Sequence, residues 1–218
     1  MELLSIRTAR FIGAISTSEL NPRGLLVYPT LIDGLVERYG FLVAPDENAV
    51  FDEEAGIVFE DGAWNNVAID KVTIFTDGIV IDTRSTTKDS EAIFEEALTW
   101  AAASYGLTYK PEMVSRRVYV SEIVFRTQGV LGSLNAKLDP LAERLSGLLK
   151  QYSGFAVKHE VTSIGFHYDH TDSKFTPASF RVERLENSPF SQNKYYSSAP
   201  VPTEDHIALL EEFEAILS

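Results

Sequence analysis

The hydrophobic and polar positions of this chain follow the same order twice. In the first round, an apolar stretch rich in β-branched residues at 3–15 predicts a strand. After a polar loop, Pro29 is suited to begin a helix, and large apolar residues recur at helical spacing up to Tyr39. Gly40 is a plausible end for this helix, because glycine adopts the left-handed conformation that often terminates helices.

Two Asp-Gly pairs then separate strand-like runs. Asp61-Gly62 and Asp77-Gly78 predict tight hairpin turns, since both residue types tolerate the positive φ that such turns require. We therefore expect an antiparallel meander with strands near 56–60, 66–76 and 79–84. A helix should follow from Thr87 to Tyr105, with Glu91, Glu95 and Glu96 on its solvated face.

The pattern restarts with a predicted strand at 114–126. Asp139 and Pro140 then resemble an N-cap and the first residue of a helix that continues to Ser153. Later elements are strands at about 155–167 and 175–185, an irregular stretch or short strand within 186–202, and a final helix from Thr203.

Two sequence echoes support an internal duplication. Both Thr87 and Thr203 begin the pattern Thr-x-Asp-x-x-Ala followed by two apolar residues and two glutamates. Each threonine is expected to cap the first turn of its own helix. Gly34–Tyr39 also resembles Gly147–Tyr152 at nearly the same offset.

The predicted fold is α+β, with a strand, helix, antiparallel strands and helix used twice. We assign the repeats to residues 1–110 and 111–218 within one continuous globular domain. This element order resembles the fold of the TATA-binding protein, which implies a curved antiparallel sheet with helices on one face. The resemblance concerns topology and implies no function.

Composition excludes several kinds of function. With 32 acidic and 19 basic residues the net charge is -13, which argues against binding the phosphate backbone of nucleic acids. The absence of cysteine excludes disulfides, thiolate nucleophiles and cysteine metal ligands. Without a signal peptide or a long apolar stretch, we expect a cytoplasmic protein that does not enter a membrane.

The densest group of metal-binding residue types contains His167, Asp169, His170 and Asp172. These side chains could hold zinc, manganese or iron. On a strand they would alternate between two faces, so they could converge only if the segment coils tightly. His159 and His206 could act as a general base, but surface positions are the favoured interpretation. No cofactor is expected.

The 186–202 segment is the other candidate site. Phe190, Lys194, Tyr195 and Tyr196 could form a partner-binding surface, or the aromatic rings could hold a long loop against the sheet. Residues Ser188–Pro200 resemble a C-terminal segment of an uncharacterised bacterial protein family, and this resemblance implies no activity.

These observations predict a non-enzymatic interaction or assembly module that binds a protein partner or a second copy of itself. Its expected contact surface is the open sheet face together with the 186–202 segment. The alternative function is a metal-dependent hydrolase centred on His167, Asp169, His170 and Asp172. A third possibility is an acidic mimic of nucleic acid that occupies a nucleic-acid-binding protein.

Overall fold

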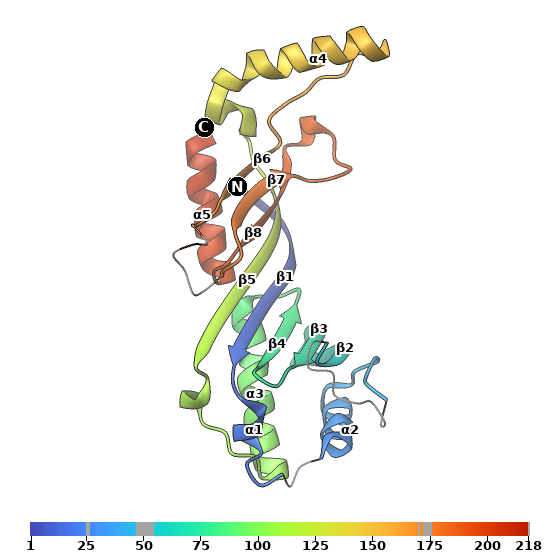
Figure 1. Ribbon diagram of the computed structural model, residues 1–218, viewed down its shortest axis with the longest axis vertical. Coiled ribbons are helices and arrows are strands. Elements are labelled where there is room, and N and C mark those ends of the chain that lie inside the picture. Colours follow the sequence, from blue (N-terminus) through green and yellow to red (C-terminus); the bar gives the residue numbers. More distant parts are fainter. Residues whose placement is uncertain (25–26, 47–54, 170, 172–175, 218) are drawn as a thin grey trace. The chain divides into compact units, whose positions relative to one another are not determined.

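A computed structural model describes residues 1–24, 27–46, 55–169, 171 and 176–217 of the 218-residue chain (Figure 1). Its strands are β1 (Glu2–Ala14), β2 (Ile57–Trp64), β3 (Val67–Ile74), β4 (Gly78–Thr83), β5 (Arg116–Arg126), β6 (Ser163–Phe166), β7 (Phe180–Arg184) and β8 (Lys194–Ala199). The α-helices are α1 (Thr17–Leu20), α2 (Tyr28–Tyr39), α3 (Thr87–Tyr105), α4 (Asp139–Ser153) and α5 (Thr203–Leu217), with 3-10 helices η1 (Pro111–Met113), η2 (Leu131–Leu138) and η3 (Phe190–Gln192).

The strands form one open antiparallel sheet, and several helices pack against it, which confirms the predicted α+β class. The strand order is β2-β3-β4-β1-β5-β8-β7-β6. Contacts divide the chain into two compact units, and the repeats expected at 1–110 and 111–218 stay a prediction. One unit combines Ile6–Ser121 with Pro200–Glu204, and the other combines Met1–Ser5, Glu122–Ala199 and Asp205–Ser218.

In the unit containing 6–121, the core lies between one sheet face and the helices α2 and α3. Phe11 of β1, Phe59 of β2 and Ile81 of β4 are almost completely buried and belong to one cluster with Leu35 of α2 and Phe94 of α3. Period-two alternation along the strands places these side chains on the same face. Burial of this face is the main source of stability for the unit.

The first hairpin turn is not where the sequence predicted it. Strand β2 continues through Asp61-Gly62, and the turn to β3 is made by Asn65 and Asn66, with φ values of 45° and 66°. Asparagine also tolerates positive φ, and this pair separates the two strands by only two residues. The second turn is made by Phe75–Asp77, and Gly78 is already the first residue of β4, so this turn lies beside the predicted Asp77-Gly78 pair rather than on it. Neither Asp77 nor Gly78 has a positive φ.

In the other unit, the strands after α4 are shorter than predicted. Among the described residues, 163–166 of the predicted strand at 155–167 and 180–184 of the one at 175–185 pair in the sheet, while residue 175 lies outside the described part. The 186–202 segment contributes β8, which pairs with β7. Helix α4 follows directly from η2, so Leu138 occupies the N-cap position that was predicted for Asp139.

The C-terminal ends of α2 and α3 agree with the prediction, whereas the N-cap of α3 differs from it. Gly40 and Gly106 end α2 and α3 in the left-handed conformation, with φ of 64° and 70°. However, Thr86 rather than Thr87 caps α3: its hydroxyl accepts from the backbone N–H of Asp89, whose carboxylate accepts from the N–H of Thr86. This reciprocal pair is a capping box.

Thr87 instead pairs with its counterpart in the repeat. The backbone N–H of Thr203 donates to Oγ1 of Thr87 at 2.9 Å, and the N–H of Thr87 donates to Oγ1 of Thr203 at 3.0 Å. Both residues are buried. The first residues of α3 and α5 therefore satisfy each other's amide groups. This finding corrects the expectation that each threonine caps its own helix.

We predict that Thr87→Val and Thr203→Val each lower the free energy of unfolding by about 1–3 kcal/mol. Each change keeps the side-chain volume but leaves one buried backbone N–H without an acceptor. Urea denaturation measures the effect. The matched control is Thr99→Val on the exposed side of α3, whose cost should stay within about 0.5 kcal/mol. Equal costs at all three positions would show that the pair contributes no stability.

Candidate functional site

The four residues predicted to bind a partner lie on β8 and in the turn before it. Tyr195 is completely buried: its ring centroid is 5.8 Å from that of Phe125, and its hydroxyl accepts from the backbone N–H of Leu131 at 3.1 Å. Lys194 and Tyr196 are half-buried. Only Phe190 presents a large exposed apolar surface, with 39% of its area accessible.

Arg184 holds this segment in place. Its guanidinium donates to the carbonyl oxygen of Phe190 at 2.8 Å and to Oδ1 of Asn193 at 3.2 Å. The same group lies 4.9 Å from the ring centroid of Phe190 and 4.8 Å from that of Tyr195. These cation–π and hydrogen-bond contacts favour the interpretation in which the aromatic rings hold the segment against the sheet.

The predicted metal cluster is described only in part. Nδ1 of His167 is 2.7 Å from the hydroxyl of Ser179, and Asp169 accepts from the backbone N–H and the hydroxyl of Thr171. The contacts from Thr171 lower the pKa of the Asp169 carboxyl and are typical of an Asx-turn. His170 and Asp172 lie outside the described residues. Within the described ranges, no group of three or more histidine, aspartate or glutamate residues could hold a metal ion.

His206 is a core residue, which corrects the expectation of a surface position. It is completely buried, and its Nε2 lies 2.8 Å from the hydroxyl of Ser197. Because that hydroxyl donates to the carbonyl oxygen of Arg181, Nε2 must be the donor to it. The helical spacing of His206 with the buried Leu210 and Phe213 was a signal for this orientation.

His159 contacts a serine that the sequence did not connect with it. Its Nδ1 is 2.9 Å from the hydroxyl of Ser146, which also accepts from the backbone N–H of His159 and lies 2.8 Å from the carbonyl oxygen of Ala142. This contact fastens the segment that follows α4 to one side of the helix. With the hydroxyl committed to the helix carbonyl, the geometry fits a structural contact better than an activated nucleophile.

The glutamates of α3 form a half-buried network rather than the predicted solvated face. Each one contacts an arginine and a tyrosine: Glu96 pairs with Arg38 and Tyr39, Glu95 with Arg117 and Tyr109, and Glu91 with Arg117 and Tyr119. Burial is the largest cause that raises the pKa of each tyrosine, followed by its hydrogen bond to a glutamate, and the pKa of Tyr119 reaches about 12.

The face of strands β1 to β4 that points away from helices α2 and α3 carries a row of side chains of alternating charge. In register across the four strands lie Glu60, Lys71, Asp82 and Arg10. Lys71 lies 3.3 Å from Glu60, and Arg10 makes a bidentate contact with Asp82 at 2.6 and 2.7 Å. The two positive and two negative charges compensate one another. This part of the predicted contact surface therefore has no net charge that would attract a partner of opposite charge.

The largest exposed apolar surface among the described helices lies on α4. None of its residues is buried, although its apolar side chains recur at helical spacing. The exposed fractions are 66% for Leu141, 50% for Leu145, 40% for Leu148, 39% for Leu149 and 80% for Tyr152. We call these five residues the α4 stripe. The sequence predicted the helix and its leucines but not that the stripe is uncovered.

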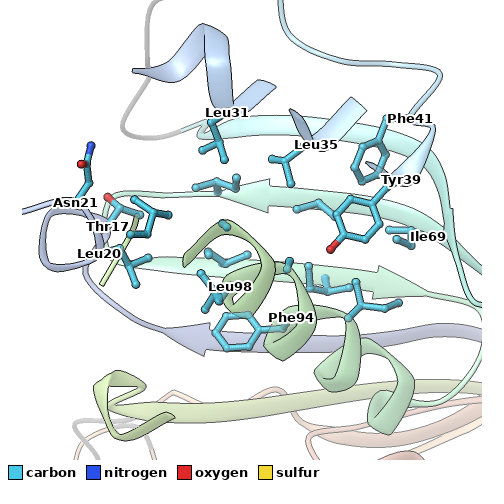
Figure 2. Close-up of a pocket in the computed structure, with 18 of the residues that line it drawn as sticks. Thr17, Leu20, Asn21, Leu31, Leu35, Tyr39, Phe41, Ile69, Phe94 and Leu98 are labelled. Atoms are coloured by element: carbon cyan, nitrogen blue, oxygen red, sulfur yellow. The ribbon is translucent and has the colours of Figure 1, made fainter. Parts of the chain in front are cut away.

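A second feature is an apolar pocket between α2, α3 and the inner face of the sheet (Figure 2). The cavity has a volume of about 100 Å³. Figure 2 shows Leu31 and Leu35 on one side, Phe94 and Leu98 on the other, and Thr17 and Asn21 at one edge. Isoleucines from β3, β4 and α3 complete the wall: Ile69, Ile74, Ile79, Ile81 and Ile93.

Comparison of the chain with models of known protein families gave no match, and a search of curated proteins also found no relative. The resemblance of Ser188–Pro200 to a bacterial family stays a prediction. In the part of the chain that the structure describes, none of the helices combines the length and apolar character needed to span a bilayer.

The tyrosine network predicts a pH dependence. The pKa of Tyr119 is raised above the ordinary value of about 10, so its contribution to stability is complete below pH 10 and disappears as pH rises towards 12. Tyr119→Phe should therefore reduce the loss of unfolding free energy between about pH 10 and 12, measured by urea denaturation at each pH. Tyr105→Phe, at the C-terminal end of α3, controls for the loss of one tyrosine. Equal slopes in all three proteins would contradict the prediction.

Proposed function

We propose that this chain is a non-enzymatic assembly module that pairs with a second copy of itself through the α4 stripe. The observation that carries the proposal is an amphipathic helix of 15 residues in which no residue is buried. Large exposed apolar patches are rare on monomeric proteins and often mark interaction surfaces. The contact from Ser146 to His159 covers a different side of α4 and leaves the stripe accessible.

The comparison with α2 strengthens this view. Gly34–Tyr39 of α2 resembles Gly147–Tyr152 of α4, yet Leu35 and Tyr39 are 6% and 4% exposed, whereas Leu148 and Tyr152 are 40% and 80% exposed. In α2 the pattern covers a sheet face within its own unit. The same pattern in α4 covers nothing among the described residues, so its apolar side chains are available for another chain.

The spacing of the stripe suits a second copy in the antiparallel direction. Leu141, Leu145, Leu148 and Tyr152 are separated by four, three and four residues, an order that reads the same in both directions. An antiparallel copy therefore places Leu145 against Leu148 and Leu141 against Tyr152, as in knobs-into-holes packing. Such a contact has two-fold symmetry, which is the commonest symmetry of soluble oligomers.

Charge favours self-association at this helix in particular. The chain carries a net charge of -13, so two copies repel each other over most surfaces. Helix α4 contains two acidic residues, Asp139 and Glu143, and two basic residues, Arg144 and Lys150, so its net charge is zero. In the antiparallel arrangement Arg144 borders Gln151 of the second copy, and like charges do not meet.

We further propose that the fold arose by duplication and has the topology predicted from the TATA-binding protein. The strand order supports this idea, because β2-β3-β4-β1 from one edge matches β6-β7-β8-β5 from the other. In that correspondence α4 is the counterpart of α2. The metal-dependent hydrolase, the nucleic-acid mimic and partner binding at Phe190 stay predictions, and no observation on the described residues favours them over the α4 contact.

We predict that Leu145→Glu with Leu148→Glu weakens dimerisation at least about tenfold, because each carboxylate would enter an apolar contact. Sedimentation equilibrium over a range of concentrations measures the dissociation constant. Both positions are exposed, so folding should be preserved. Gly147→Glu is the matched control: it adds a carboxylate on the opposite side of α4, where nothing lies within 4 Å of a new Cβ. A wild-type chain that stays monomeric at high concentration would overturn the proposal.

Crosslinking tests the antiparallel direction. The chain has no cysteine, so Leu141→Cys and Tyr152→Cys each introduce a single thiol. We predict that oxidation of a mixture of the two variants gives a disulfide-linked heterodimer, since only that pair brings the Cα atoms within about 7 Å. Each variant oxidised alone should stay uncrosslinked. Crosslinks within each single variant would instead indicate parallel helices.

A further inference from the structure

We propose that the pocket between α2, α3 and the sheet binds a small, uncharged apolar molecule, or the hydrocarbon part of a larger one. This inference does not depend on the α4 contact. It rests on the composition of the pocket wall, on the contacts that keep the pocket open and on its volume.

The wall presents almost only hydrocarbon to the cavity. Among its residues the polar side chains are Thr17, Asn21 and Tyr39. The hydroxyl of Tyr39 donates to Glu96, and that of Thr17 donates to the carbonyl oxygen of Thr76 at 3.1 Å. Asn21 lies at the edge of the pocket in Figure 2. A buried water needs two to four polar partners, so this cavity favours an apolar occupant.

Close contacts around the cavity keep the two helices from closing it. A Cβ at Gly34 of α2 would lie 1.9 Å from the hydroxyl oxygen of Tyr105, so these two helices already touch closely. At the C-terminal end of α2, Arg38 and Tyr39 both bind Glu96 of α3. A Cβ at Gly13 of β1 would lie 2.4 Å from the Phe94 ring, which fixes α3 against the sheet. The helices are therefore held at positions that leave the space between them unfilled.

The volume sets the size of the ligand. The cavity of about 100 Å³ is somewhat smaller than an engineered apolar cavity of roughly 150 Å³ that stays dry and binds benzene or xenon. The enclosed part of the ligand should therefore be no larger than about a benzene ring. A charged group of the same size should be excluded, because the wall offers it no compensating charge.

The experiment uses the full chain with isoleucine methyl groups labelled for NMR and benzene as the probe. We expect saturable shifts of the signals from the five wall isoleucines, Ile69, Ile74, Ile79, Ile81 and Ile93, and none from Ile123 or Ile164 in the other unit. Benzoate, similar in size but charged, should shift none of them. Equal responses to benzene and benzoate, or the absence of saturable shifts at the wall, would overturn the proposal.

A pair of variants gives a second measurement. Ala97→Leu adds volume at the wall and should weaken benzene binding at least tenfold, whereas Ala103→Leu on the exposed side of the same helix should leave it unchanged. Undiminished binding in a folded Ala97→Leu protein would place benzene elsewhere and contradict the assignment. If Ala97→Leu fails to fold, the comparison of benzene with benzoate in the wild-type chain still decides.

Discussion

The exchange of hydrogen bonds between Thr87 and Thr203 is the constraint on which the helix positions depend. The first residues of two helices, 116 positions apart in sequence, provide the acceptors for each other's buried amides. An unsatisfied amide at either place would be costly, so α3 and α5 must begin together. Thr86, the preceding residue, is the N-cap of α3, so two neighbouring threonines fix the start of this helix. Phe94 of the same helix belongs to the core cluster.

The chain uses one amphipathic pattern for two purposes. In α2 the pattern closes a core, and the contact through Gly34 leaves an apolar space beneath the helix. In α4 the related pattern has no sheet under it within the described residues and stays exposed. Hydrophobic periodicity specifies which side of a helix is apolar, but the surface that covers this side is decided by tertiary packing. An exposed apolar surface can therefore arise without a new motif.

Much of the fold was predictable because local patterns determine it. The first strand, the helices ending at Gly40 and Gly106, and the approximate place of the turn before Gly78 all depend on neighbouring residues. The turn at Asn65-Asn66 was missed because two residue pairs tolerate positive φ, and strand pairing selects between them. The site was less predictable, because burial of Tyr195, exposure of the α4 stripe and the volume of the pocket arise only when distant segments pack.

The composition of the two compact units has a consequence for synthesis on the ribosome. The unit built mainly from 6–121 includes Pro200–Glu204, and the other unit includes Met1–Ser5. Each unit therefore needs residues from the opposite end of the chain. The unit built from 6–121 cannot complete its buried hydrogen bonds until residues 200–204 have also emerged, so the chain cannot fold strictly one repeat at a time.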